Sequence, residues 1–104
     1  MIEIHASYQD MSLRMDGHAN AQRNEHDHDL VCCAASILVQ TLVRSCGLCH
    51  GVAVIGDAAS GHVNIRIDCT KIGRAAAIHR YQMCLDGLEM LEKSYPQSLR
   101  VQYS

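Results

Sequence analysis

The chain contains no tryptophan and no phenylalanine, and only four tyrosines among its 104 residues. Its core must therefore be built from aliphatic side chains, and the hydrophobic share of 48% is sufficient for one such core. Excess positive charge is also missing, since the formal net charge is -2. A protein that binds RNA or DNA through phosphates normally carries a basic surface, so we expect no direct nucleic-acid partner.

The sequence has no recognisable export signal at its beginning. Glu3, His5 and Asp10 interrupt any apolar run of the signal-peptide kind. We also expect no stretch that approaches the length of a membrane-spanning helix. These features predict a cytoplasmic protein without a membrane partner, whose six cysteines are mostly reduced and form no disulfide framework.

Two kinds of hydrophobic pattern predict a single domain over residues 1–104. Alternating apolar and polar residues predict strands, and apolar residues at helical spacing predict helices. Gly56 to Gly61 reads as a turn. The order ββαββαβ predicts an α+β fold, with two helices packed on a mostly antiparallel sheet of about five strands. The expected strands cover 2–6, 11–16, 51–55, 63–69 and 99–103, and the expected helices cover 29–47 and about 71–93.

Residues 19–28 contain no large apolar side chain that would anchor them to a core. We expect this segment to be a surface loop, and long polar loops in compact domains are often lids or binding loops. Its position, directly between His18 and the first expected helix, makes it a candidate binding loop.

Cys32 is a candidate nucleophile because of its place in the first expected helix. With Asp29 as N-cap, Cys32 is the third helical residue, near the unpaired N–H groups and the positive end of the helix dipole. Such a position favours the thiolate and offers N–H donors to an oxyanion. Ser36 lies one turn further on, and His18 is a candidate base. The simpler interpretation is that Cys32 packs as a small hydrophobe in a largely buried, apolar helix.

Two other cysteine patterns point to different chemistry. The run from Cys46 to His50 matches the c-type haem attachment pattern and the Cys-x-x-Cys redox pattern, but haem attachment needs export, so we expect both thiols to pack. The alternative function is a small non-catalytic zinc-binding or regulatory domain. Because the spacing resembles no closed zinc module, we expect no cofactor and no metal. The zinc ligands would come from His26, His28 and Cys32, with Asp27, Asp29 and Cys33 as further donors.

The run Gly17-His18-Ala19, followed by Asp29-Leu30-Val31-Cys32 and Ala34-Ala35-Ser36, resembles the bacterial ribosomal-processing cysteine protease family, called Prp. The resemblance implies an α+β fold and a homodimer. It also implies cleavage of the N-terminal extension of large-subunit ribosomal protein twenty-seven, which supports ribosome assembly. The family's nucleophile falls on Cys32 and its general acid/base on His18, with Gly17, Asp29 and Ser36 as supporting positions.

The chain departs from the family pattern at three points. The loop between His18 and Asp29 is roughly two residues longer than expected, a change that loops usually tolerate. Leu30 replaces an isoleucine, and Cys33 replaces an alanine, which places two thiols side by side. The preceding Asp-Leu-Val run favours Cys32 as the nucleophile, while His26 and His28 compete with His18 for the role of base.

Overall fold

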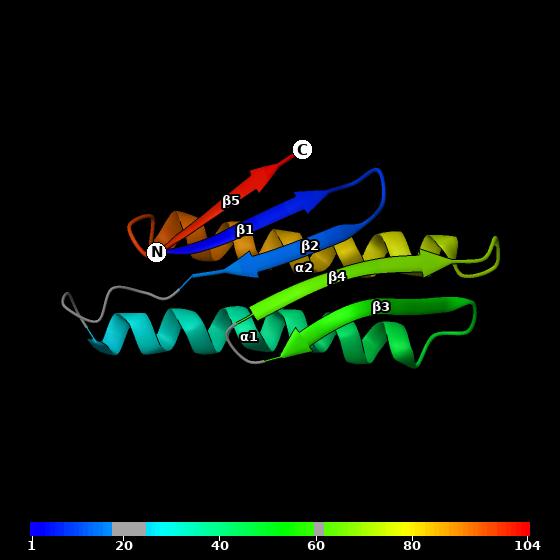
Figure 1. Ribbon diagram of the computed structural model, residues 1–104, viewed down its shortest axis with the longest axis horizontal. Coiled ribbons are helices and arrows are strands. Elements are labelled where there is room, and N and C mark those ends of the chain that lie inside the picture. Colours follow the sequence, from blue (N-terminus) through cyan, green and yellow to red (C-terminus); the bar gives the residue numbers. More distant parts are fainter. Residues whose placement is uncertain (18–24, 60–61) are drawn as a thin grey trace.

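In the part of the chain that the structure describes, a five-stranded sheet carries two helices on one of its faces (Figure 1). This computed structural model describes residues 1–17, 25–59 and 62–104, with only the backbone described for residues 25–29. The predicted order ββαββαβ and the predicted α+β class are confirmed. The elements are β1 (Ile2–Ser7), β2 (Ser12–Asp16), α1 (Glu25–Gly47), β3 (Val52–Ala59), β4 (His62–Cys69), α2 (Arg74–Ser94) and β5 (Leu99–Tyr103).

The sheet has the strand order β3-β4-β2-β1-β5. The pairs β1–β2, β2–β4 and β3–β4 are antiparallel, and β1–β5 is parallel. The sheet is therefore mostly antiparallel, as predicted. The parallel pair brings the first and last strands of the chain side by side at one edge, and β3 forms the other edge (Figure 1).

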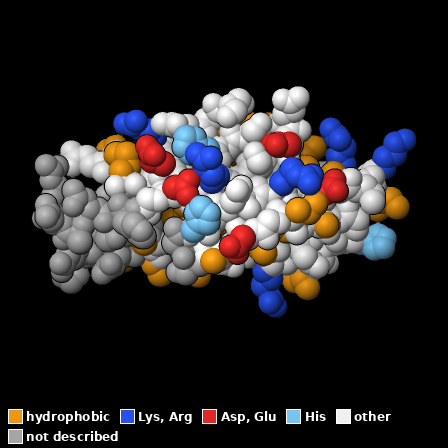
Figure 2. Space-filling view, viewed as in Figure 1, with side chains coloured by type: hydrophobic (Ala, Val, Ile, Leu, Met, Phe, Trp, Pro, Cys, Tyr) orange, Lys and Arg blue, Asp and Glu red, His pale blue; other side chains and the backbone are white. Residues whose placement is uncertain are grey.

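Alternation along the strands separates a buried face from an open one. Ile4, Leu13 and Ile65 are buried beneath the helices, whereas their neighbours in sequence point to the other face. An antiparallel sheet tolerates such a solvated face because polar side chains can occupy every second position. Figure 2 shows this open face, over which charged and histidine side chains are spread.

The two helices run side by side on the sheet and bury one stripe each. The expectation that α1 is largely buried is wrong, because Leu30 and Ile37 are 59% and 62% exposed. One face of α1 meets the sheet and its other face has no described neighbour, so only one set of positions at helical spacing can be buried. The fully or nearly fully buried positions of α1 are Val31, Ala35, Val39, Leu42 and Cys46.

The segment Leu30–Gly47 is long and apolar enough, by length and composition alone, to cross a membrane, with a mean hydropathy of 1.6. This corrects the expectation that no stretch reaches such a length. About 28% of this window is buried within the domain, and its buried stripe packs in the same core as the sheet. A core helix that covers a sheet passes the same test, so length and composition alone do not show that this segment crosses a membrane.

Strand β3 extends four residues beyond its predicted end, through part of the expected turn at 56–61. Gly56 pairs with Ile65 and has φ +120°, a conformation that favours glycine. A Cβ at this position would lie 2.2 Å from the backbone oxygen of Asn64. Glycine therefore continues the strand here, where the sequence pattern reads it as a break.

Tyr81 fastens α2 to the β1–β2 hairpin. Its hydroxyl lies 2.5 Å from the carbonyl oxygen of Ser12 and 3.1 Å from that of Ser7, and it donates to these carbonyls. The side chain is 1% exposed, and burial raises its pKa. The only fully buried large aromatic among the described residues thus has its polar atom satisfied, as a buried tyrosine requires.

Candidate active site

Helix α1 places Cys32 further from the helix start than the sequence predicts. The helix begins at Glu25, so Asp29 is its fifth residue and Cys32 its eighth. The predicted N-cap at Asp29 is therefore wrong. No proline or glycine occurs between Glu25 and Gly47, so nothing in the sequence stops the helix from starting before Asp29.

The earlier helix start removes one part of the predicted chemistry. Only the first four N–H groups of a helix lack an intrahelical acceptor, and in α1 all of these precede Asp29. The backbone N–H of Cys32 has an intrahelical acceptor, the carbonyl oxygen four residues before it. The expectation that helix-terminal N–H groups at Cys32 form an oxyanion hole is therefore wrong for this structure.

Cys32 lies on a flank of α1, between its buried and its exposed faces. Its side chain is half-buried and packs against the hydrophobic core, whereas the neighbouring Cys33 is exposed. Ser36 follows Cys32 by four residues, so the two side chains share one flank of the helix with Cβ atoms about 5–6 Å apart. This flank is distinct from the one that contacts α2, where Leu38 packs against Gly87.

A cavity of about 210 Å³ opens on the same flank, next to Ser36. It lies between α1 and the sheet, at the end where β2 and β3 finish and β4 begins. Gln40 closes one side, because its Nε2 donates a 2.7 Å hydrogen bond to the carbonyl oxygen of Ala58 at the sheet edge. A half-buried thiol one helical turn from a mainly apolar cavity can meet a peptide whose side chain enters that cavity. The cavity is lined by Met15, Ser36, Val39, Gln40, Ala59 and Val63.

Gly17 ends the described part of the chain after β2, in a backbone conformation that favours glycine. Its φ is +104°, and a Cβ there would lie 2.3 Å from the backbone oxygen of Met1. The backbone therefore bends at Gly17, immediately before His18 in the sequence. His18 and residues 19–24 of the predicted loop lie outside the described residues, as do the side chains of His26, His28 and Asp29. The prediction of a loop is wrong for residues 25–28, which form the start of α1.

Sequence reasoning missed a polar network of three side chains at the same end of the sheet. Asp16 Oδ2 lies 2.9 Å from Arg14 Nε, and Asp16 Oδ1 lies 2.9 Å from His62 Nδ1. The network lies on the open face and joins the last residue of β2 to the first of β4. Because these side chains are 38–60% exposed, each pair contributes only about 0–1 kcal/mol to stability. Only the strand register, which sequence patterns do not supply, brings His62 beside Asp16.

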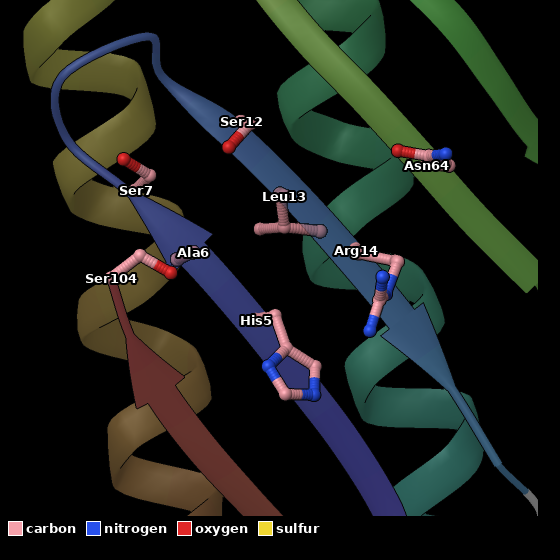
Figure 3. Close-up of a pocket in the computed structure, with 8 residues that line it drawn as sticks. All are labelled: His5, Ala6, Ser7, Ser12, Leu13, Arg14, Asn64 and Ser104. Carbon is pink, nitrogen blue, oxygen red and sulfur yellow. The ribbon is translucent and has the colours of Figure 1, made fainter.

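A shallower cavity of about 320 Å³ lies on the open face of the sheet (Figure 3). His5, Arg14 and Asn64 project into it from the three neighbouring strands β1, β2 and β4. Ser7, Ser12 and Ser104 add polar groups to its rim. The helices cover the opposite face, so this depression is separated from the flank of Cys32 by the sheet itself.

The other cysteines bear on two predictions, reduced thiols and the alternative of a zinc site. Cys33, Cys46, Cys49, Cys69 and Cys84 are all free thiols, as the prediction of mostly reduced cysteines requires. Among the residues that the structure describes, no group of three or more His, Cys, Asp or Glu side chains has an arrangement that could hold a metal ion. His26 and His28, the central ligands of the zinc alternative, have side chains outside that description.

A sequence model of one protein family, cysteine protease Prp, matches residues 1–100. The chain belongs to the cysteine protease Prp family. The recognised family is thereby confirmed, and so is the prediction that the protein is an enzyme, a peptide-bond hydrolase of the cysteine type. A search of curated proteins finds no match.

Solved Prp structures have the same fold over their whole length. The chain is similar to an essential ribosomal processing protease Prp from S. aureus with a covalently linked product peptide, at 27% identity and a TM-score of 0.74, with 100% of both chains covered. The same holds for the S. aureus Prp with a substrate peptide, at 26% identity and a TM-score of 0.74, again with 100% of both chains covered. A protein of Streptococcus mutans, 22% identical over 98% of this chain and 90% of that one, shares the fold with a TM-score of 0.67.

Proposed function

We propose that this Prp protease removes the N-terminal extension of large-subunit ribosomal protein twenty-seven and thereby supports ribosome assembly in the bacterial cytoplasm. The observation that carries the proposal is the match to the family over residues 1–100, joined to full-length similarity with a ribosomal processing protease in complex with its peptides. The half-buried thiol, one helical turn from the Ser36 that lines a mainly apolar cavity, supports it, because an extended peptide needs both a nucleophile and a pocket.

Cys32 is the nucleophile of this proposal. Its thiolate attacks the scissile carbonyl carbon, the amine leaves, and a thioester between Cys32 and the substrate forms. Water then hydrolyses the thioester and restores the thiol. The position of Cys32, one turn from Ser36 and the cavity, supports this assignment over the exposed Cys33.

His18 is the general acid and base. It protonates the leaving amine and later removes a proton from the attacking water. Gly17 supports this role through the backbone bend that immediately precedes His18. Asp29, which is not the helix cap, orients His18 in this proposal. Ser36 forms a hydrogen bond with the reacting groups on the flank that it shares with Cys32.

Cleavage of the ribosomal protein itself tests the activity and the nucleophile together. The purified chain is incubated with the ribosomal protein bearing its extension, and with a version that lacks the extension as a control substrate. We expect the wild type and Cys33→Ala to shorten only the extended substrate, and Cys32→Ala to leave it intact. Trimming by Cys32→Ala at the wild-type rate would show that Cys32 is not the nucleophile.

The assignment of the base needs its own comparison of three histidine variants. We expect His18→Ala to lower kcat about 10²–10⁴-fold, the usual contribution of a positioned acid/base group. His26→Ala and His28→Ala should stay close to the wild-type rate. A large loss in either of these two, with His18→Ala active, would move the role of base to that histidine.

We further propose that the enzyme is a homodimer without nucleic-acid, membrane or cofactor partners. Large apolar side chains on the outer surfaces of both helices support self-association, with Leu30, Ile37, Met83 and Met90 each 59–74% exposed. Light scattering after size exclusion should give twice the chain mass, and Ile37→Asp should give the monomer mass. A monomeric wild type at tens of micromolar would contradict the proposal.

A further inference from the structure

The turn between α1 and β3 brings together two thiols that peptide hydrolysis does not use. Cys46 is in the last turn of α1, and Cys49 follows it by three residues. The backbone N–H of Cys49 donates a 3.1 Å hydrogen bond to the carbonyl oxygen of Cys46. A turn closed in this way holds the two Cα atoms within roughly 7 Å of each other. Disulfides need a Cα separation of roughly 4.4–6.8 Å, so the backbone spacing fits a bond between them.

The two thiols differ in their access to solvent. Cys46 is 0% exposed within the core, whereas Cys49 is partly exposed in the turn. The two residues between them leave room for movement, since a Cβ on Gly47 would meet no atom within 4 Å and Leu48 is 76% exposed. A reagent in solution can therefore reach Cys49 first, and the turn can then adjust to present Cys46.

Cys46 has two possible thiol partners nearby, Cys49 and Cys84. Burial raises the pKa of the Cys46 thiol, the positive charge of Arg80 opposes this shift, and the neighbouring Cys49 adds to it. Cys84 also lies in the core and interacts with Cys46, but burial raises the pKa of the Cys84 thiol from 9.0 to about 12. Cys84 is in addition within 3.6 Å of the carbonyl oxygen of Leu38, to which it donates. Cys84 is thus the less reactive of the two possible partners.

We propose that Cys46 and Cys49 form a dithiol that a small-molecule disulfide, such as glutathione disulfide, converts reversibly into an intramolecular disulfide at the α1–β3 turn. The Cys49 thiolate attacks one sulfur of glutathione disulfide and expels one glutathione thiolate, which leaves a mixed disulfide on Cys49. The Cys46 thiolate then attacks Cys49 Sγ and expels the second glutathione. The two protons of the cysteine thiols pass to the two glutathione thiolates, so one disulfide is consumed and one is formed.

This site is separate from the proposed nucleophile. Cys46 follows Cys32 by fourteen residues along the same helix, which corresponds to about 21 Å at 1.5 Å per residue. Oxidation of the pair therefore neither needs nor blocks the Cys32 thiol directly. The pair links the end of α1 to the turn that leads into β3, whose far end contributes Ala59 to the cavity beside Ser36.

The tryptic peptides of this chain allow a direct test. Cleavage after Arg44 and Arg66 releases residues 45–66, which contain Cys46 and Cys49 and no other cysteine. Cys32 and Cys33, Cys69, and Cys84 fall on three other peptides, 24–44, 67–71 and 81–93. The folded full-length protein is equilibrated in glutathione buffers of increasing oxidation, quenched with an alkylating reagent, digested and analysed by mass spectrometry.

We expect peptide 45–66 to lose two hydrogen atoms and to escape alkylation in oxidising buffer, and to regain both alkyl groups after reduction. In Cys46→Ser, Cys49 should accumulate as the mixed disulfide with glutathione, and in Cys49→Ser the buried Cys46 should remain a thiol. Cys69→Ser is the matched control and should leave the pair unchanged. A link between peptides 45–66 and 81–93, glutathione retained on wild-type Cys49, or full alkylation of 45–66 in oxidising buffer would each overturn the proposal.

Discussion

Gly17 shows how one residue without a side chain determines where the candidate site begins. Its positive φ turns the chain away from β2, one residue before His18, and the nearby backbone oxygen of Met1 leaves no room for a Cβ. A bend at this position can be read from the sequence, because glycine before a polar segment is a strong local signal. Sequence reasoning did not identify Asp16 and His62, whose contact depends on the register of two strands distant in sequence.

Substitution of Gly17 by alanine tests this residue-scale claim. A Cβ would collide with a backbone oxygen at 2.3 Å in a conformation that L-residues rarely adopt. We expect Gly17→Ala to lower the free energy of unfolding by about 1–3 kcal/mol and to reduce cleavage at temperatures where it stays folded. Urea unfolding measures the first effect. Gly47→Ala is the matched control, because its site is open and helical, and unchanged stability in both variants would refute the claim.

At the scale of elements, the sequence predicted the order and type of every described helix and strand. The strict alternation in 63–69 fits only a strand, and the spacing of apolar residues in α2 fits only a helix, so each pattern identifies its element. The boundaries of α1 and β3 were wrong for physical reasons. A polar segment without proline or glycine can extend a helix, as before Asp29, and a glycine can continue a strand where partner strands approach closely, as at Gly56.

The contact between α1 and β3 is also an element-scale feature that the sequence did not reveal. Gln40 donates to the carbonyl oxygen of Ala58 across the cavity beside Ser36. We expect Gln40→Ala to lower the free energy of unfolding by about 0.5–1.5 kcal/mol, the net value of one hydrogen bond, and to raise KM more than it lowers kcat. The exposed neighbour Thr41→Ala serves as control. If the two variants behave alike in both assays, the hydrogen bond does not shape the cavity.

At the scale of the whole molecule, an aliphatic core with buried thiols and a buried tyrosine makes stability sensitive to alkaline pH. Burial raises the pKa of Cys84 from 9.0 to about 12 and raises those of Cys46 and Tyr81 as well. Above pH 9 the unfolded chain loses these protons while the folded chain retains them. The folded state then binds more protons than the unfolded one, so the free energy of unfolding falls as pH rises from about 9 toward 12.

Thermal unfolding at a series of pH values measures this effect. We expect the wild-type Tm to fall steadily above pH 9, and that of Cys84→Ala to fall less between pH 8.5 and 10.5. The reason is that unfolding of the variant releases roughly one proton fewer in this range. Its Tm at pH 7 will be lower because a buried side chain is truncated, so the comparison is between slopes. Cys33→Ala, at an exposed position, should keep the wild-type slope. Parallel curves for wild type and Cys84→Ala would contradict this account.

We propose that Cys32 performs nucleophilic catalysis in this Prp-family peptidase. The most direct measurement is covalent trapping with a halomethyl ketone peptide that reproduces the residues before the scissile bond of the ribosomal protein extension. Fragmentation of peptide 24–44 distinguishes Cys32 from Cys33 by mass spectrometry. If Cys32 is the nucleophile, we expect one adduct per chain, on Cys32, with loss of cleavage in proportion to labelling. An adduct on Cys33, or full cleavage activity after stoichiometric labelling of Cys32, would contradict the proposal.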